Sequence, residues 1–260
     1  MASRYPSFDP GGQTVEPPEL PDGPGLYVQF QPRYSLYLES EGEGEFVISA
    51  QVSKWHGKPW PSLDSPADAP PIHFTINLQS NNDVLVSNNI TVGTEAKVLS
   101  FSFGDLKPRF EPYDVVLYGA MEDGEPTVEA TSELLYLPEK DEGSVTKLDN
   151  WKGGMVFRNA ETDGKFEPLL PYGFYASCDN FLCENNSISA IQEYFDLGLN
   201  GMVPLTTIFD SRPVFEFFDE LDLKFMYDLR SIYQNLTEVE KQVSAIANFD
   251  ALYGYWGSDE

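Results

Sequence analysis

Apolar and polar residues alternate with a period of two through the first half of the chain. Segment 99–103 is typical, because Leu99, Phe101 and Phe103 alternate with two serines. Successive side chains of a β-strand point to opposite faces, so this alternation predicts strands that bury one face. Polar turns between the strands predict an antiparallel, immunoglobulin-like β-sandwich over residues 25–138. The predicted strands are 26–28, 46–52, 72–78, 84–86, 99–103, 115–118 and 133–137.

After Leu170 the pattern changes to short apolar strands that alternate with amphipathic helices. Pro213 is expected to open the second helix, and Thr237 to begin a capping box that opens the third. Alternating strands and helices predict a parallel sheet, which we interpret as the first half of a TIM (β/α)₈ barrel over residues 171–260. A doubly wound sheet fits the period equally well. The strands are predicted at 172–176, 201–205, 223–228 and 253–260.

Two further regions complete the predicted organisation. Residues 1–24 are rich in Pro, Gly and Asp, which indicates an irregular leader. Residues 139–170 contain Asp163-Gly164, a dipeptide that favours a tight turn, and we expect a linker hairpin there. The predicted domains are therefore leader 1–24, β-sandwich 25–138, linker hairpin 139–170 and partial barrel 171–260.

Functional side chains of parallel sheets gather at the carboxyl ends of the strands. That rule selects carboxylates, an arginine and aromatic residues from the α/β part of the chain. Carboxylates and Arg hydrogen-bond to hydroxyl groups, and the apolar face of a sugar ring stacks on Trp or Tyr, so this set favours carbohydrate binding. The candidates are Tyr175, Asp179, Asp228, Arg230, Trp256, Asp259 and Glu260.

Each main candidate also has a structural interpretation. Glu260 is the last residue and can be a solvated carboxylate without a role in catalysis. Asp228 can simply form an ion pair with Arg230, two residues later. Trp256 lies in an apolar strand and can belong to the core.

Three segments of the second half resemble glycoside hydrolases that have an N-terminal β-sandwich and a (β/α)₈ barrel. Segment 163–175, Asp-Gly-Lys-Phe-Glu-Pro-Leu-Leu-Pro-Tyr-Gly-Phe-Tyr, is similar to the hairpin that leads into the first barrel strand of those enzymes. Segment 195–203 is similar to their passage from the first helix to the second strand, and 255–260, Tyr-Trp-Gly-Ser-Asp-Glu, to their fourth strand. The resemblance covers residues 160–260, with the motifs in order.

The resemblance implies a retaining mechanism, with an acid/base on strand four and a nucleophile on strand seven. Carried over to this chain, it makes Glu260 the acid/base. Asp259 stands where these relatives usually have an Asn that contacts the sugar 2-hydroxyl. The nucleophile would lie beyond residue 260, so the 260-residue chain alone is expected to be hydrolytically inactive.

The composition limits the classes of partner. The chain has 42 Asp and Glu against 16 Lys and Arg, a formal net charge of −26. Nucleic acids and anionic membranes are therefore not expected as partners, because phosphate binding depends on Lys and Arg. His56, His73 and the cysteines lack the spacing of metal ligands, and no phosphate-binding loop or Gly-x-Gly-x-x-Gly is present, so no metal or cofactor is expected. Composition does not indicate an oligomeric state.

The only cysteines, Cys178 and Cys183, are five residues apart in one loop. They can form a disulfide in an oxidising compartment, or remain two unpaired thiols. Sequons begin at Asn89, Asn185 and Asn235 and favour secretion, although the first residues lack the apolar core of a signal peptide. We therefore expect an extracellular protein, with a cytoplasmic location as the alternative.

Two rival functions remain open from sequence. The chain can be a non-catalytic carbohydrate-binding or cell-surface protein in which the β-sandwich binds the ligand. It can also be an α/β enzyme of another kind, against which the missing phosphate-binding and nucleophile motifs count.

Overall fold

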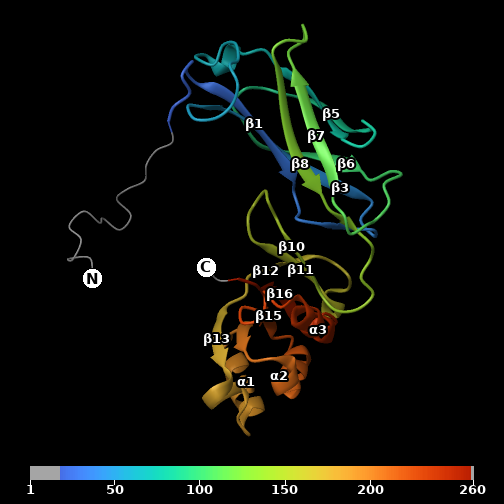
Figure 1. Cartoon of the computed structure of the whole chain (residues 1–260), viewed down its shortest axis with the longest axis vertical. Coiled ribbons are helices and arrows are strands. Elements are labelled where there is room, and N and C mark those ends of the chain that lie inside the picture. The colour runs from blue at the N-terminus through green and yellow to red at the C-terminus, as the bar shows by residue number, and fades with distance from the viewer. Residues whose placement is uncertain (1–17, 259–260) are drawn as a thin grey trace, which may run out of the picture. The chain divides into compact units, whose positions relative to one another are not determined.

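The computed structural model describes residues 18–258. These residues form two compact units (Figure 1), and each is described by itself. The first contains 18–33, Glu41–Lys107 and Glu111–Leu135, and the second contains Tyr34–Ser40, Pro108–Phe110 and 136–258. Most of the predicted leader lies outside the described residues, as do Asp259 and Glu260. No helix within 18–258 is long and apolar enough to cross a membrane.

The first unit is built from two antiparallel sheets. A three-stranded sheet has the order β1-β3-β6, and a four-stranded sheet has the order β5-β4-β7-β8. A short 3₁₀ turn, η2 (Pro66–Asp68), lies in the connection between the sheets. The strands are β1 (Gly25–Pro32), β3 (Glu43–Ser53), β4 (Ile72–Leu78), β5 (Val84–Ile90), β6 (Thr94–Ser102), β7 (Tyr113–Ala120) and β8 (Thr127–Leu134).

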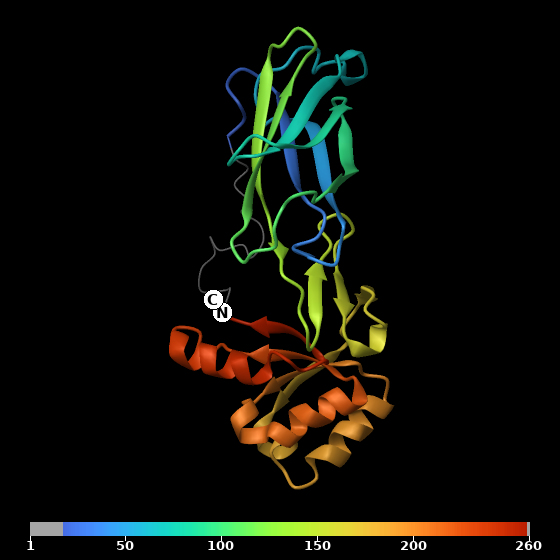
Figure 2. The same cartoon turned by 90° about the vertical axis from the view of Figure 1, so that its right-hand side faces the viewer.

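Each sheet of this unit buries one face, as the period of two predicts. Strand β4 shows the rule: its four apolar residues are buried, and the polar residues between them are exposed or half-buried. On the other sheet, the rings of Phe46 and Phe101 stack with centroids 4.5 Å apart. Phe46 is fully buried, and Phe30 packs against it from the neighbouring strand. Figure 2 shows the two sheets as separate layers.

The last predicted strand of this unit was placed wrongly. The prediction was 133–137, whereas β8 begins six residues earlier, at Thr127. Only Val128 and Leu134 are buried in β8, so its alternation is too weak to be seen in the sequence. Residues Tyr136–Leu137 form a separate strand, β9, which pairs in parallel with β2 (Tyr37–Leu38) inside the second unit. The second unit thus takes segments from within the predicted sandwich.

A three-stranded antiparallel sheet stands where a single hairpin was predicted. It contains β10 (Val145–Leu148), β11 (Met155–Arg158) and β12 (Glu167–Leu169), with the 3₁₀ turn η3 (Ala160–Thr162) before the last strand. The Ser144 hydroxyl donates a hydrogen bond to the carbonyl of Leu252, and the Asn159 amide donates to the carbonyl of Asp250. This small sheet is therefore attached to the chain where the last strand begins.

The rest of the second unit is a four-stranded parallel sheet whose strands follow one another in chain order. The order is β13-β14-β15-β16, and every neighbouring pair is parallel. The elements are β13 (Gly173–Ser177), an irregular helical turn η4 (Cys178–Leu182), α1 (Ser187–Asp196), β14 (Gly201–Leu205), α2 (Ile208–Leu221), β15 (Lys224–Asp228), α3 (Leu236–Ile246) and β16 (Leu252–Trp256).

All three helices pack on one face of this sheet (Figure 2). One buried cluster joins Ile191 of α1, Phe215 of α2 and Ile246 of α3 to Phe225 and other residues that point the same way from the strands. A doubly wound sheet has helices on both faces and a reversal in strand order. Neither feature occurs in the described residues, so the observed topology differs from that alternative.

Residues of the opposite face alternate with the buried cluster and are half-buried or exposed. On β16 an extra residue, Tyr253, shifts the register, so that Gly254 pairs with Met226 and Trp256 pairs with Asp228. The shift turns Trp256 away from the helices. No helix in residues 18–258 covers this face, which carries Tyr175, Val203, Leu205, Met226, Asp228 and Trp256.

Two helix starts also differ from the prediction. Helix α2 begins at Ile208 with Thr207 as its N-cap and is interrupted at Ser211, so Pro213 lies just after the break rather than at the start. Asn235, not Thr237, caps α3, because its side-chain oxygen accepts the backbone N–H of Glu238. Asn and Thr are both good caps, and their spacing alone did not distinguish them.

Candidate functional site

Two aromatic rings meet on the uncovered face, Tyr175 from the middle of β13 and Trp256 from the carboxyl end of β16. Tyr175 and Trp256 stack with centroids 5.1 Å apart and an interplanar angle of 29°. Two strands separate β13 from β16 in the sheet, and in a flat sheet their backbones would lie roughly 14 Å apart. Direct ring contact across two strands therefore indicates that this face is concave at its carboxyl edge. Tyr175 remains 62% exposed, so one side of the pair is open to solvent.

Arg230 adds a charge to the aromatic pair. Its guanidinium carbon lies 3.6 Å from the centre of the Trp256 ring, which is within the range of a cation–π interaction. The same guanidinium donates two hydrogen bonds, each 2.9 Å long, to the two oxygens of Asp228. The backbone N–H of Arg230 also donates to Asp228. Carboxylate, guanidinium and indole therefore form one connected group.

Asp228 is held in its charged form by this arrangement. Partial burial alone would raise the pKa of the Asp228 carboxyl, but the hydrogen bonds and the positive charge of Arg230 outweigh burial and lower the pKa below its ordinary value. An ionised carboxylate that already accepts three hydrogen bonds is poorly suited to donate a proton. The structure thus pairs Asp228 with Arg230, as the structural interpretation expects, and a substrate-binding role for Asp228 stays a prediction.

Trp256 does not belong to the core under the helices. It is half-buried and lies on the uncovered face, where it contacts Tyr175 and Arg230. The apolar side chains between the two aromatic residues come from the middle strands. Val203, Leu205 and Met226 are half-buried on that same face and were not selected from the sequence. Their alternation with buried residues in the predicted strands is the signal that could have found them.

The loop after β13 is closed by a disulfide. Cys178 and Cys183 are bonded, with their Cα atoms 4.8 Å apart. Asp179 lies inside this loop, exposed, and its backbone carbonyl accepts a hydrogen bond from the Ser177 hydroxyl. Among the described residues, no hydrogen bond or ring contact joins the Asp179 side chain to the aromatic pair. The structure therefore does not bring this candidate together with Tyr175, Asp228, Arg230 and Trp256.

The described part of the chain shows no cluster of His, Cys, Asp and Glu that could hold a metal ion. The predicted acid/base, Glu260, and its neighbour Asp259 lie outside the described residues, and their roles stay predictions. Strand β16 ends at Trp256, four positions before Glu260. The described part of the candidate site therefore consists of the Tyr175–Trp256 stack and the Arg230–Asp228 ion pair beside it.

No protein-family model matches the chain, and no curated protein matches it. Solved structures similar to it include Bacteroides uniformis β-glucuronidase 3, with a TM-score of 0.35 and 14% identity over 88% of this chain and 28% of that chain. Ruminococcus gnavus β-glucuronidase has a TM-score of 0.32 and 7% identity, and covers 89% and 38%. A putative β-galactosidase from Bacteroides fragilis has a TM-score of 0.27 and 11% identity, and covers 90% and 33%.

These structural neighbours are glycoside hydrolases, and the chain spans only between 28% and 38% of their length. TM-scores this far below 0.5 establish no common fold. The functional argument therefore rests on the residues of the chain itself.

Proposed function

We propose that this chain is the N-terminal portion of a glycoside hydrolase that cleaves O-glycosidic bonds of a carbohydrate. The first unit would be its immunoglobulin-like β-sandwich, and the parallel sheet of the second unit the first half of its (β/α)₈ barrel. The observation that carries the proposal is the open Tyr175–Trp256 stack at the carboxyl edge of the sheet, with the Arg230–Asp228 pair beside it.

The topology supports half a barrel in three ways. The strands follow chain order, as they do around a barrel. Within residues 18–258 the helices cover one face of the sheet, whereas parallel sheets are normally buried on both faces, so the other face is expected to have a cover. The ring contact between Tyr175 and Trp256 requires the sheet to curl towards that bare face. Four further strands would close the barrel and bury Val203, Leu205 and Met226.

The chemistry of the edge supports a sugar as the ligand. The exposed ring of Tyr175, supported from behind by Trp256, offers a flat apolar surface to the C–H face of a sugar ring. A guanidinium and a carboxylate beside it offer directional hydrogen bonds to hydroxyl groups. In the proposed mechanism Glu260 protonates the glycosidic oxygen and then activates water, while a carboxylate beyond residue 260 acts as the nucleophile. Asp259 would contact the sugar beside the reacting bond.

An extracellular location is part of the proposal. The Cys178–Cys183 disulfide supports it, because disulfides persist in oxidising compartments and are rare in the cytosol. The excess of acidic residues suits a protein that works on carbohydrate rather than on phosphate-bearing partners.

Hydrolysis assays with a polypeptide extended by its downstream coding sequence test the proposal. We expect the extended protein to release the aryl group from at least one aryl β-glycoside in a panel that includes a glucuronide, a galactoside and a glucoside. Glu260→Gln should reduce the rate at least about 100-fold, since general acid catalysis contributes 10²–10⁴-fold. Glu220→Gln, a change at an exposed position of α2, is the control. An extended protein with full activity after Glu260→Gln would refute the assignment.

A further inference from the structure

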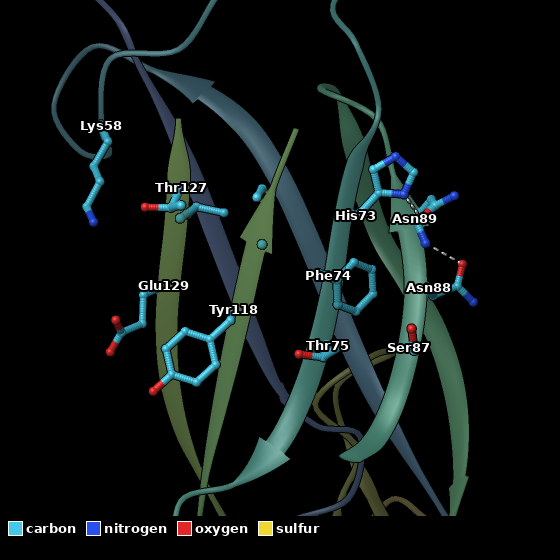
Figure 3. A pocket seen from close by; sticks show the side chains of 13 residues that line it. Lys58, His73, Phe74, Thr75, Ser87, Asn88, Asn89, Tyr118, Thr127 and Glu129 are labelled. Carbon is cyan, nitrogen blue, oxygen red and sulfur yellow. Dashed lines mark hydrogen bonds between the residues drawn. The ribbon is translucent and has the colours of Figure 1, made fainter. Parts of the chain in front are cut away.

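A hollow lies on the outer face of the four-stranded sheet of the first unit, far along the sequence from the candidate site (Figure 3). Its volume is about 410 Å³, which falls within the range of small-molecule sites, and it is open on one side. It is lined by side chains from all four strands and by Lys58 from a loop. Thr75, Tyr118 and Glu129 alternate with buried residues of their strands and point away from the core of the sheet.

The strand register explains why the surface is hollow. Two rows of side chains cross the sheet on this face, and each has one short side chain on a central strand, Thr75 in one row and Ala120 in the other. One row places Thr75 of β4 beside Tyr118 of β7, with Ser87 and Glu129 at its ends. The other row consists of Asn89, His73, Ala120 and Thr127. The short side chains of Thr75 and Ala120 leave a depression beside the larger Tyr118 and His73.

Tyr118 supplies an open aromatic ring at this depression. It is 45% exposed and projects from the middle of the sheet beside Glu129 (Figure 3). A tyrosine held on a strand is a rigid surface with two torsions, so little conformational entropy is lost when a ligand stacks on it. Beside the ring, the lining presents hydroxyl groups from Thr75, Ser87 and Thr127.

One hydrogen bond determines which ring nitrogen of His73, at the border of the hollow, carries the proton. The Nδ1 atom of His73 lies 2.7 Å from the Oδ1 atom of Asn89. An amide oxygen only accepts, so Nδ1 carries the proton, and in the neutral ring Nε2 is left as an acceptor. Lys97, on β6 of the three-stranded sheet, donates to the Asn89 carbonyl and to the Asn88 side chain, and these bonds hold this border in place.

The charged residues that line the hollow limit the class of ligand that it can bind. The charged residues of the lining are Lys58 and Glu129, so the hollow is balanced although the chain carries −26 overall. An anionic ligand would approach against the net charge of the protein. A neutral ligand with many hydroxyl groups and one apolar face satisfies the ring, the hydroxyls, the imidazole and the amide together. We propose that this hollow is a binding site for a neutral carbohydrate, separate from the edge of the parallel sheet.

An array of neutral oligosaccharides built from glucose, galactose, mannose and xylose is the first test. The 260-residue chain should come from a bacterial host that adds no N-linked sugar, because Asn89 begins a sequon. We expect at least one printed oligosaccharide to bind. Titration calorimetry with that oligosaccharide then gives the dissociation constant of each variant. Absence of binding to every printed sugar would overturn the proposal.

Matched variants locate the binding site. Tyr118→Ala should weaken affinity about tenfold, the effect of losing roughly 1.4 kcal/mol of ring contact. Thr75→Val keeps the shape and removes one hydroxyl, and should weaken affinity several-fold. Thr131→Ala, on the same face of β8 but opposite Val116 and outside the hollow, should leave affinity unchanged. Circular dichroism and the melting temperature verify that each variant is folded.

Trp256→Ala separates this site from the proposed active site. Affinity that survives Trp256→Ala and falls with Tyr118→Ala supports the hollow as the binding site. The reverse pattern would place the bound sugar at the parallel sheet and refute the inference, while leaving the proposed hydrolase intact. Failure of the hydrolysis assay, in turn, leaves the binding result unaffected.

Discussion

The guanidinium carbon of Arg230 lies 3.6 Å from the centre of the Trp256 ring, and this contact joins the ends of two neighbouring strands. Arg230 follows β15 and Trp256 ends β16. Both oxygens of Asp228 accept hydrogen bonds from the same guanidinium and fix its orientation. The positive charge of Arg230 is therefore held in one position against the Trp256 ring. Tyr175 then stacks on an indole whose position is already fixed.

Arg230→Lys is expected to destabilise the carboxyl edge of the parallel sheet, although the positive charge is retained. Lysine cannot form the two-pronged contact with Asp228 or lie flat against Trp256. We expect a loss of about 1–2 kcal/mol of local stability, from one charged hydrogen bond and the cation–π contact. Hydrogen exchange of segment 225–230, followed by mass spectrometry, should be about tenfold faster in the variant. Arg212→Lys, a change at an exposed position of α2, is the control. Equal exchange rates in the parent, Arg230→Lys and Arg212→Lys would show that the contacts of Arg230 do not stabilise this segment.

Asp228→Asn should produce a stability difference that depends on pH. The pKa of Asp228 in the folded protein is lowered from its usual value of 3.8. Its ionised form therefore stabilises the fold above that value, and this contribution is lost as the pH falls through the folded-state pKa. We expect the variant to be about 1–2 kcal/mol less stable at pH 7 and equal to the parent in strong acid.

Urea unfolding at a series of pH values measures this difference. Glu220→Gln provides the control, because Glu220 is exposed on α2 and its replacement should give a small, flat difference. A difference for Asp228→Asn that does not shrink towards low pH would show that the ion pair is not its cause.

The fold was predictable where one face of an element is buried throughout. Strand β4 is an example, because every second residue is apolar and buried. Strand β8 was misplaced because the small residues Ala130 and Ser132 occupy two of its four inward positions. The segment Tyr37–Leu38 could not be assigned, since its pairing with β9 joins residues 99 positions apart and has no local pattern.

The candidate site was predictable as a set of residues but not as a set of contacts. The strand-end rule selected Tyr175, Asp228, Arg230 and Trp256, and the structure brings these four together. It also selected Asp179, which the disulfide loop keeps apart. The stack of Tyr175 on Trp256 depends on the curl of the sheet and on the register shift at Tyr253. Both are properties of strand pairing, for which a single sequence carries no local signal.

Asn235→Ala and Thr237→Ala distinguish the observed helix start from the predicted one. Asn235 caps α3 by accepting the backbone N–H of Glu238, so its replacement should cost about 1 kcal/mol of helix stability. Thr237 lies inside the first turn and is exposed, so its replacement should have little effect. Hydrogen exchange along 236–246 measures both. Equal effects of the two variants would show that the cap is shared or lies elsewhere.

Removal of the Cys178–Cys183 disulfide should loosen the loop that follows β13. The bond closes a short loop, for which the chain-entropy estimate is about 2 kcal/mol. We expect the double variant Cys178→Ser with Cys183→Ser to unfold at lower urea concentration than the oxidised parent. A reducing agent should lower the stability of the parent towards that of the variant and leave the variant unchanged. Alkylation of two thiols in the native, oxidised parent would show instead that the cysteines are unpaired, and would remove the main support for an extracellular location.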